Sequence, residues 1–239
     1  MGDKRPVARS GKNEGQTDYT TGQAPQGGPR MPMRQCKYLD RIATLPDIFT
    51  PEECNQIINT GLNDWTKEDA KIQRDEGIKI EENFVDDLDY RNTTLFIPPK
   101  PDEWLFGKIL DSILKFNSHE TGFRFDVQGL AEPPNLMRYQ AADLDKNGKP
   151  GHYDWHMDVG PGEVPSMRKL SYTLLLNPDE YEGGELSFHI GRNLDEPFPG
   201  QDKIGAMIVF PSYLMHKVGH VTSGTRYAIV GWAHGNSFI

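Results

Sequence analysis

The chain has 239 residues with 36% hydrophobic residues and a net charge of −9, enough for one well-buried domain with a small helical addition. The acidic charge argues against nucleic acid as the main partner, because binding to phosphates favours a basic surface. Two cysteines, Cys36 and Cys54, no apolar run of membrane-spanning length and no signal-peptide stretch predict a protein of a reducing, cytoplasmic compartment without a membrane partner.

Residues 1–34 differ from the rest of the chain, because ten of them are Gly or Pro and none is Leu, Ile, Phe, Trp or Cys. Such a segment cannot bury enough apolar surface to offset the entropy lost on ordering. It is predicted to be a flexible tail, with a segment packed across the body or a neighbour as the alternative. The domain is predicted to span residues 35–239, with helical support over 35–121 and a β core over 122–239.

Two helices are predicted before the β core. Thr50-Pro51-Glu52-Glu53 is a capping box with proline at the first helical position, and apolar residues follow it at helical spacing. A second apolar stripe predicts a helix from Pro101 to about Asn117. The charged segment 64–92 between them is predicted to be an exposed loop, with a flexible lid near a site as the alternative.

From about Gly122 the pattern changes to short strands separated by Gly and Pro. Apolar and polar residues alternate over 170–176, as in a half-buried strand. Further strands are predicted over 185–190, 206–210, 217–222 and 226–232, the last two on either side of a turn at residues 223–225. Six or more short strands predict a sandwich or barrel and argue against a βαβ fold.

The side chains with the clearest chemistry lie in this β region. His156 and Asp158 form a His-x-Asp pair, and His216 and Arg226 follow it. Two histidines and one carboxylate are the ligand set of iron sites that keep open coordination positions for an oxygenase. An arginine offers a planar fork that binds a carboxylate with two hydrogen bonds. Together these residues predict a dicarboxylate cosubstrate held between iron and guanidinium.

Spacing alone leaves rivals for these positions. His152 and Asp154 form a second His-x-Asp pair with the same strand parity, and parity also makes His220 a rival to His216. Three further histidines have no partner motif and are interpreted as ordinary core or surface residues: His119, His189 and His234.

The arrangement of the last strands decides whether the candidate side chains can meet. In a flat hairpin turning at Gly224, Arg226 would lie about 20 Å from His216, because each strand residue advances the chain by about 3.3 Å. If the chain instead crosses between two facing sheets, about 10 Å apart, the inward faces share one cavity. A metal site therefore requires a sandwich rolled into a barrel.

Three stretches resemble the 2-oxoglutarate and Fe(II)-dependent dioxygenases, specifically their prolyl 4-hydroxylase-like branch. Tyr153–Asp158 is similar to the family's Tyr-x-x-His-x-Asp, which favours His156 over His152. Residues 168–177 and 181–186 resemble its strand ending in Leu-Asn and its Gly-Gly-Glu-Leu turn. Residues 210–232 resemble its final His-x-Val, Gly-x-Arg and Trp elements, and the likeness covers about residues 38–235.

The chain departs from the family pattern in three places. The stretch Ala141–Lys149, between Tyr139 and the His-x-Asp motif, looks longer than usual. His220 stands where members often have Pro, and it is interpreted as a cavity-lining residue. Leu175 stands where some prolyl hydroxylases carry a cosubstrate-binding tyrosine, so Tyr139 and Arg226 are expected to do more of the binding.

The resemblance implies a mainly β fold with flanking helices, a double-stranded β-helix or cupin-like jelly-roll barrel. It implies that His156, Asp158 and His216 bind Fe(II) as catalytic residues. Arg226, the fourth catalytic residue, would pair with the far carboxylate of 2-oxoglutarate. The other residues expected to contact the cosubstrate are Tyr139, Ser171, Val218 and Trp232. O2 is the co-oxidant, and ascorbate is a candidate further cofactor.

The implied activity is hydroxylation of a C–H bond with release of succinate and CO2. The expected substrate is a prolyl residue of a peptide or protein, and a free amino acid or other small molecule is the alternative. Two other classes use similar ligands: a non-catalytic metal-binding barrel, and a metal-dependent hydrolase or isomerase. The intact Arg226 counts against a purely structural metal, which has no need of a carboxylate fork.

Overall fold

The computed structural model of the protein describes residues 41–70, 72–73, 84–85, 87–101, 103–190 and 197–237. The predicted tail over residues 1–34 lies outside these residues, so the tail and the domain boundary stay predictions. No helix in the described part of the chain has both the length and the apolar character needed to span a membrane.

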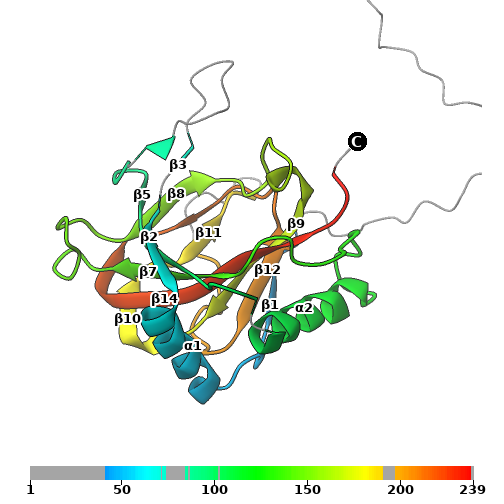
Figure 1. Cartoon of the computed structure of the whole chain (residues 1–239), viewed down its shortest axis with the longest axis horizontal. Helices are drawn as coiled ribbons and strands as arrows, with labels where there is room; N and C mark the ends of the chain where they lie inside the picture. The colour runs from blue at the N-terminus through cyan, green and yellow to red at the C-terminus, as the bar shows by residue number, and fades with distance from the viewer. Residues whose placement is uncertain are drawn as a thin grey trace, which may run out of the picture. The chain divides into compact units, whose positions relative to one another are not determined.

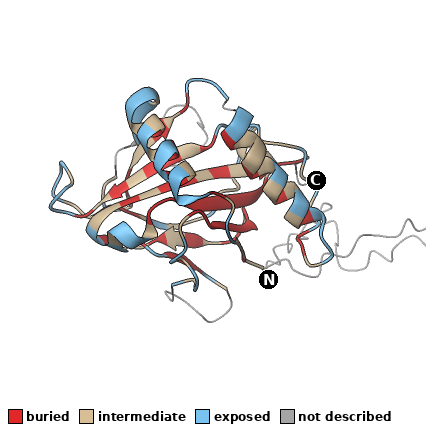
Figure 2. Ribbon diagram, turned by 90° about the horizontal axis from the view of Figure 1, so that it is seen from below, coloured by how far each residue is buried: buried red, intermediate tan, exposed pale blue. Residues whose placement is uncertain are grey.

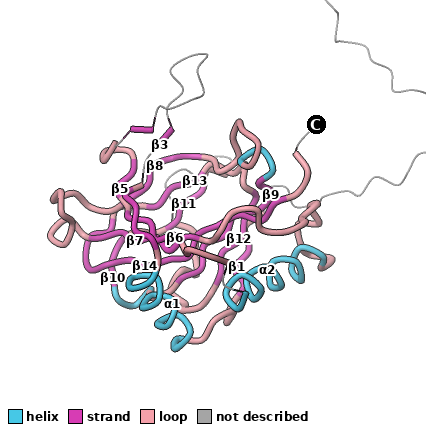
Figure 3. The backbone as a smooth tube through the Cα atoms, in the orientation of Figure 1, coloured by secondary structure: helices cyan, strands magenta, loops and turns pink. Residues whose placement is uncertain are grey.

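The two predicted helices are confirmed. Helix α1 spans Pro51–Asp64 and begins with the predicted capping box, in which the Glu53 N–H donates to the Thr50 hydroxyl and the Thr50 N–H donates to the Glu53 carboxylate. Helix α2 spans Glu103–Ser118 and buries one apolar stripe. Both helices lie on the same side of the strands (Figures 1 and 3).

The described strands form a large sheet, a smaller one and a separate pair of strands, and every named pair is antiparallel. The large sheet has the spatial order β1 (Ala43–Leu45), β12 (Met207–Pro211), β9 (Arg168–Leu175), β14 (Val221–His234), β7 (Asn135–Gln140), β6 (Thr94–Ile97) and β2 (Thr66–Asp69), with β10 (Tyr181–Gly183) paired to the start of β14. The smaller sheet has the order β11 (Leu186–Phe188), β13 (His216–Val218), β8 (His152–His156) and β5 (Arg91–Asn92). A separate two-stranded sheet joins β3 (Ile72–Gln73) to β4 (Phe84–Val85). Short 3₁₀ turns occur at Pro165–Met167 and Pro178–Glu180.

The large sheet is covered on both faces, which produces two cores. On one face the helices pack against it, so that Ile57 and Ile109 belong to the same buried cluster as Leu174. Figure 2 shows the exposed outer faces of the helices and the buried strands beneath them. On the other face a second cluster joins the large sheet to the smaller one, with Tyr139 from β7 and Val218 from β13 among its members. This two-sheet arrangement with helices on one face confirms the predicted fold class.

The alternating strand β9 is buried on both faces, which differs from the half-buried strand that its sequence predicts. Leu170, Tyr172 and Leu174 face the helices. The intervening Ser171 and Thr173 are also buried, at 1% and 5% exposure. Polar residues on a covered strand must find partners within the protein, so this pattern indicates a polar site between the sheets and not a solvated surface.

The predicted turn at residues 223–225 is wrong. Strand β14 runs unbroken from Val221 to His234, and the chain turns earlier, at Gly219-His220. Gly224 has a positive φ of 72°, which glycine adopts readily. A Cβ at this position would lie 2.3 Å from the Glu180 carbonyl oxygen, so glycine also allows the chain at the start of β10 to pass close by. Because β13 and β14 belong to different sheets, the chain crosses between the sheets as a shared cavity requires.

The prediction of a loop over 64–92 is also corrected. Residues 66–69 form β2, an exposed edge strand of the large sheet, and 91–92 form β5. Three of the four residues of β2 are charged (Lys67, Glu68 and Asp69), which is typical of an edge protected against pairing with other chains. Residues 71, 74–83 and 86 lie outside the described part, so the lid alternative stays untested.

The two faces of β9 predict separable effects of mutation. Leu174→Ala should lower the free energy of unfolding by about 2–5 kcal/mol, because it opens a cavity beneath the helices. Metal binding should be retained, since Leu174 faces away from the space between the sheets. Chemical denaturation and metal titration measure the two effects, with the half-exposed Leu144 changed to Ala as the control. Equal loss of stability in both variants would contradict the packing described here.

Candidate metal centre

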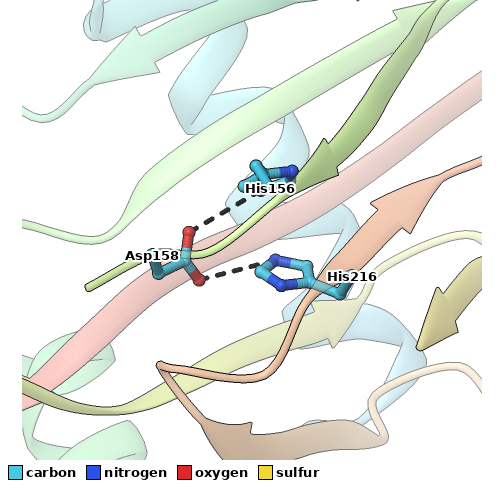
Figure 4. Close-up of side chains that lie close together, drawn as sticks. All are labelled: His156, Asp158 and His216. Atoms are coloured by element: carbon cyan, nitrogen blue, oxygen red, sulfur yellow. Dashed lines mark ion pairs between the residues drawn. The ribbon is translucent and has the colours of Figure 1, made fainter. Parts of the chain in front are cut away.

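Three of the predicted ligands meet between the sheets. His156 ends β8 and His216 begins β13, and their Cα atoms are paired in register. Asp158 follows two residues after the end of β8. One potential ligand atom from each side chain lies within 4.8 Å of the others. The Asp158 carboxylate oxygens lie 3.7 Å from His156 Nε2 and 3.5 Å from His216 Nε2 (Figure 4).

Backbone carbonyls orient both imidazoles. His156 Nδ1 lies 2.7 Å from the Asp154 carbonyl oxygen, and His216 Nδ1 lies 2.9 Å from the Leu214 carbonyl oxygen. A carbonyl accepts a hydrogen bond, so each Nδ1 carries the proton and each Nε2 presents a lone pair toward Asp158. This is the usual arrangement of metal-binding histidines, whose second nitrogen is fixed by a hydrogen bond.

Asp158 is fixed by side chain and backbone together. The Ser171 hydroxyl donates to its carboxylate over 2.6 Å, and the Asp158 N–H donates to the Ser212 carbonyl over 3.0 Å. Burial alone would raise the pKa of Asp158, but the adjacent His216 and His156 and the Ser171 hydroxyl bring it below its usual value. Ser171 is therefore a support for the carboxylate in the structure, whereas the sequence predicts it as a cosubstrate contact.

The pKa of His156 moves to about 3, first because burial disfavours a charged imidazole and next because His216 lies beside it. A neutral imidazole beside an ionised carboxylate is the protonation state that binds a divalent metal. The three side chains therefore have the geometry and the charge to hold such an ion.

A cavity of about 200 Å³ adjoins the three side chains. Tyr139, Val218 and Trp232, all predicted to contact a cosubstrate, line it together with Thr173 and Val230. Exposed Met157 also lines it. Nine of the fifteen lining residues are apolar or aromatic, and the polar ones include two arginines, Arg91 and Arg168, besides the three ligand candidates.

Arg226 lies beside this cavity and not on its wall. Its register partner on β7 is Tyr139, a wall residue whose ring centroid is 5.1 Å from the guanidinium carbon. The Arg226 residue is 1% exposed, and its three side-chain nitrogens have no hydrogen-bond partner among the described residues. Gly184 makes room for this side chain, since a Cβ there would lie 3.0 Å from Arg226 Cδ. A buried, unpaired guanidinium is costly, so this position is suited to an anionic ligand.

The rival residues are placed elsewhere. Both ring nitrogens of His152 lie 3.0 Å from backbone carbonyl oxygens, those of Pro150 and Asp89, and Asp154 is exposed. His220 is exposed at the turn between β13 and β14, with its ring against His152. The interpretation of His220 as a cavity-lining residue is therefore wrong.

Two wall residues were not singled out from the sequence. The Tyr153 ring is stacked on the His156 imidazole, with centroids 3.5 Å apart, and the Arg91 guanidinium lies over the same tyrosine ring at 4.3 Å. Burial raises the pKa of Tyr153 to about 12, so the phenol stays protonated. Tyr153 belongs to the Tyr-x-x-His-x-Asp motif, which could have identified it. Arg91 is 65 residues before His156, and no local pattern marks it.

Comparison with known proteins gives consistent matches. Residues 136–234 match the sequence model of the 2OG-Fe(II) oxygenase superfamily. A PKHD-type hydroxylase of Synechococcus sp. (strain CC9311) is 38% identical over 108 residues, which cover 44% of this chain and 46% of that protein. The PKHD-type hydroxylase PCC8801_2196 of Rippkaea orientalis is 28% identical over 204 residues, covering 80% and 77%. The chain thus spans less than half of the length of the first of these relatives.

Solved prolyl hydroxylase structures share the fold. A prolyl hydroxylase from Trichoplax adhaerens, in complex with a hypoxia inducible factor peptide fragment, has a TM-score of 0.61 at 14% identity and covers 81% of this chain and 83% of its own. A prolyl-4-hydroxylase from Pseudomonas putida has a TM-score of 0.54 at 14% identity and covers 83% and 94%. At such identity these structures bear on the fold alone. Together with the sequence matches they confirm the resemblance stated above.

The choice between the two His-x-Asp pairs can be tested by metal titration. Asp158→Ala should abolish tight binding of Co(II), because it removes the only carboxylate within reach of both imidazoles in the described part of the chain. Asp154→Ala should bind Co(II) as the unchanged protein does, since Asp154 is exposed. The opposite result would place the metal at His152 and Asp154.

Proposed function

We propose that this chain, which carries a 2OG-Fe(II) oxygenase domain, is a dioxygenase that hydroxylates a C–H bond of its substrate. His156, Asp158 and His216 would hold Fe(II), and Arg226 would pair with the far carboxylate of 2-oxoglutarate. When bound, iron, cosubstrate and O2 supply the oxidising chemistry that side chains lack, with succinate and CO2 as products. Ascorbate stays a candidate further cofactor.

The observation that carries this proposal is the unpaired, buried Arg226 next to the cavity of the three metal-ligand candidates. A metal that only stabilises the fold would leave the guanidinium without purpose. A hydrolase needs a metal and water but no carboxylate fork at this place. A dicarboxylate that reaches both the metal and Arg226 would satisfy the two features together.

The remaining side chains have supporting roles. His156 and His216 keep their Nε2 lone pairs aimed inward because their Nδ1 protons are held by carbonyls. The apolar wall residues Val218 and Val230 exclude water, which strengthens the pairing of a carboxylate with Arg226. The Thr173 hydroxyl lies on the same wall and can donate a hydrogen bond to the cosubstrate.

A prolyl residue of a peptide or protein is the proposed substrate. The relatives are named PKHD-type hydroxylases, and one structural neighbour holds a peptide fragment. Tyr153 and Trp232 offer aromatic walls that suit a pyrrolidine ring, and Met157, 51% exposed, lies at the same cavity. A free amino acid is the second candidate, because the cavity itself is small.

Anaerobic addition of Fe(II) and 2-oxoglutarate tests the proposal directly. The ternary complex should develop a visible metal-to-ligand charge-transfer band, which neither a hydrolase nor a structural metal site would give. On exposure to air with proline-containing peptides, succinate and a mass gain of one oxygen on the peptide are expected. Absence of both the band and succinate would refute the dioxygenase. Succinate without peptide oxidation would refute only the peptide substrate.

Arg226→Ala should weaken 2-oxoglutarate binding by about thirtyfold or more, because loss of one partner from a buried charged pair costs about 2 kcal/mol at least. Arg226→Lys should recover part of the affinity, since it keeps the charge but not the fork. Fluorescence or calorimetric titration of the metal-loaded protein measures the change, with the exposed Arg124 changed to Ala as the control. Unchanged affinity in Arg226→Ala would show that the carboxylate binds elsewhere.

A further inference from the structure

Of the three ligand candidates, Asp158 is the one that strand pairing does not hold. His156 and His216 belong to β8 and β13 and are opposite each other in the smaller sheet. Asp158 lies beyond the end of β8, in a stretch without regular structure, and the neighbouring Met157 is exposed. Its carboxylate therefore needs tertiary contacts to keep it at the metal.

One of these contacts comes from Arg168, at the start of β9. Its Nη1 donates to the backbone carbonyl of Asp158 over 2.9 Å. Its guanidinium carbon lies 3.6 Å from the ring centroid of Trp232, a wall residue of the cavity. A single guanidinium thus contacts both a ligand residue and the wall beside it.

Glu132 orients this guanidinium. Arg168 Nε and Nη2 donate to the two carboxylate oxygens of Glu132 over 2.7 and 2.5 Å. The side chains are only 15% and 24% exposed. This two-point pairing fixes the plane of the guanidinium and leaves Nη1 to reach Asp158. Burial tends to raise the pKa of Glu132, but hydrogen bonds from His234 and Arg168 bring it to about 2, so the carboxylate is charged at neutral pH.

His234 supports Glu132 from the other side. The Ala131 N–H donates to His234 Nδ1 over 3.0 Å, so the proton of the neutral ring is on Nε2. Nε2 lies 3.0 Å from Glu132 and donates to it. His234 is 4% exposed and belongs to the end of β14, where its Cα is paired with that of Arg168. The chain of contacts therefore runs from the paired strands β9 and β14 to the irregular segment that carries Asp158.

We propose that Glu132 and His234 are positioning residues that act through Arg168 to hold Asp158 at the metal and Trp232 at the cavity wall. Neither residue belongs to the three ligand candidates or to the lining of the cavity. The inference rests on the proposed metal centre and deepens it, because it assigns the placement of the carboxylate ligand to residues 26 positions before and 76 positions after it in the sequence.

Co(II) titration tests this proposal without turnover, since Co(II) in a nitrogen and oxygen site has visible bands that respond to ligand geometry. In Glu132→Gln, which keeps the shape of the side chain, the dissociation constant for Co(II) should rise about tenfold or more and the bands should shift. Arg168→Lys should behave in the same way, because one ammonium cannot reach both Glu132 and the Asp158 carbonyl. If only the positive charge of Arg168 mattered, Arg168→Lys would bind Co(II) as tightly as the unchanged protein.

The control is Lys108→Gln, which breaks a part-buried ion pair with Glu53 on the helices and should leave Co(II) binding and its bands unchanged. Circular dichroism checks that each variant is folded. If Glu132→Gln does not fold, the same Co(II) titration of His234→Gln tests the proposal instead. A folded variant that binds Co(II) as tightly as the unchanged protein, with the same bands, overturns the inference. If the unchanged protein itself binds no Co(II), it is the proposed metal centre that fails.

Discussion

The antiparallel pairing of β8 with β13 sets the Cα of His156 opposite that of His216, and the proposed metal centre depends on this register. A slip of one residue would turn an imidazole to the other face of the sheet, because side chains alternate along a strand. The register is fixed from the far side as well, since β13 also pairs with β11, where His216 is opposite Phe188. Phe188 and Phe210 pack near the His216 ring. Aromatic packing thus helps to orient the His216 ring.

The burial of Arg226 lowers the stability of the fold. A buried guanidinium without an acceptor destabilises the folded chain, and an apolar residue of similar size would be cheaper there. The surroundings nevertheless make room for it, with Gly184 beside its stem and the Tyr139 ring near its head. Such an arrangement becomes favourable only when an anion enters, so the ligand that satisfies Arg226 should also stabilise the whole domain through mass action.

The sequence was sufficient to predict those features that depend on local pattern. The helix beginning at Pro51 and the choice of His156 over His152 follow from spacing or motif and agree with the structure. The turn at 223–225 was misplaced because Ser-Gly-Thr has turn composition, whereas Gly224 serves a close passage of the chain. His220 was misjudged for a related reason: strand parity does not continue through the real turn at 219–220.

Long-range polar networks are what sequence patterns cannot show. His234 has no motif around it, and an isolated histidine in a strand is usually an ordinary core residue, yet its partner Glu132 lies 102 positions away. The pairing of β9 with β14 brings His234 to Arg168, and the isolated bridge between Gly129 and His234 brings Glu132 alongside. The two histidines and Asp158 are held in place by different kinds of contact. The two histidines belong to paired strands of the smaller sheet. Asp158 lies outside the strands and is held by separate contacts from the Ser171 hydroxyl, the Ser212 carbonyl and Arg168, so it is the proposed ligand whose position substitutions can change while the sheets stay paired.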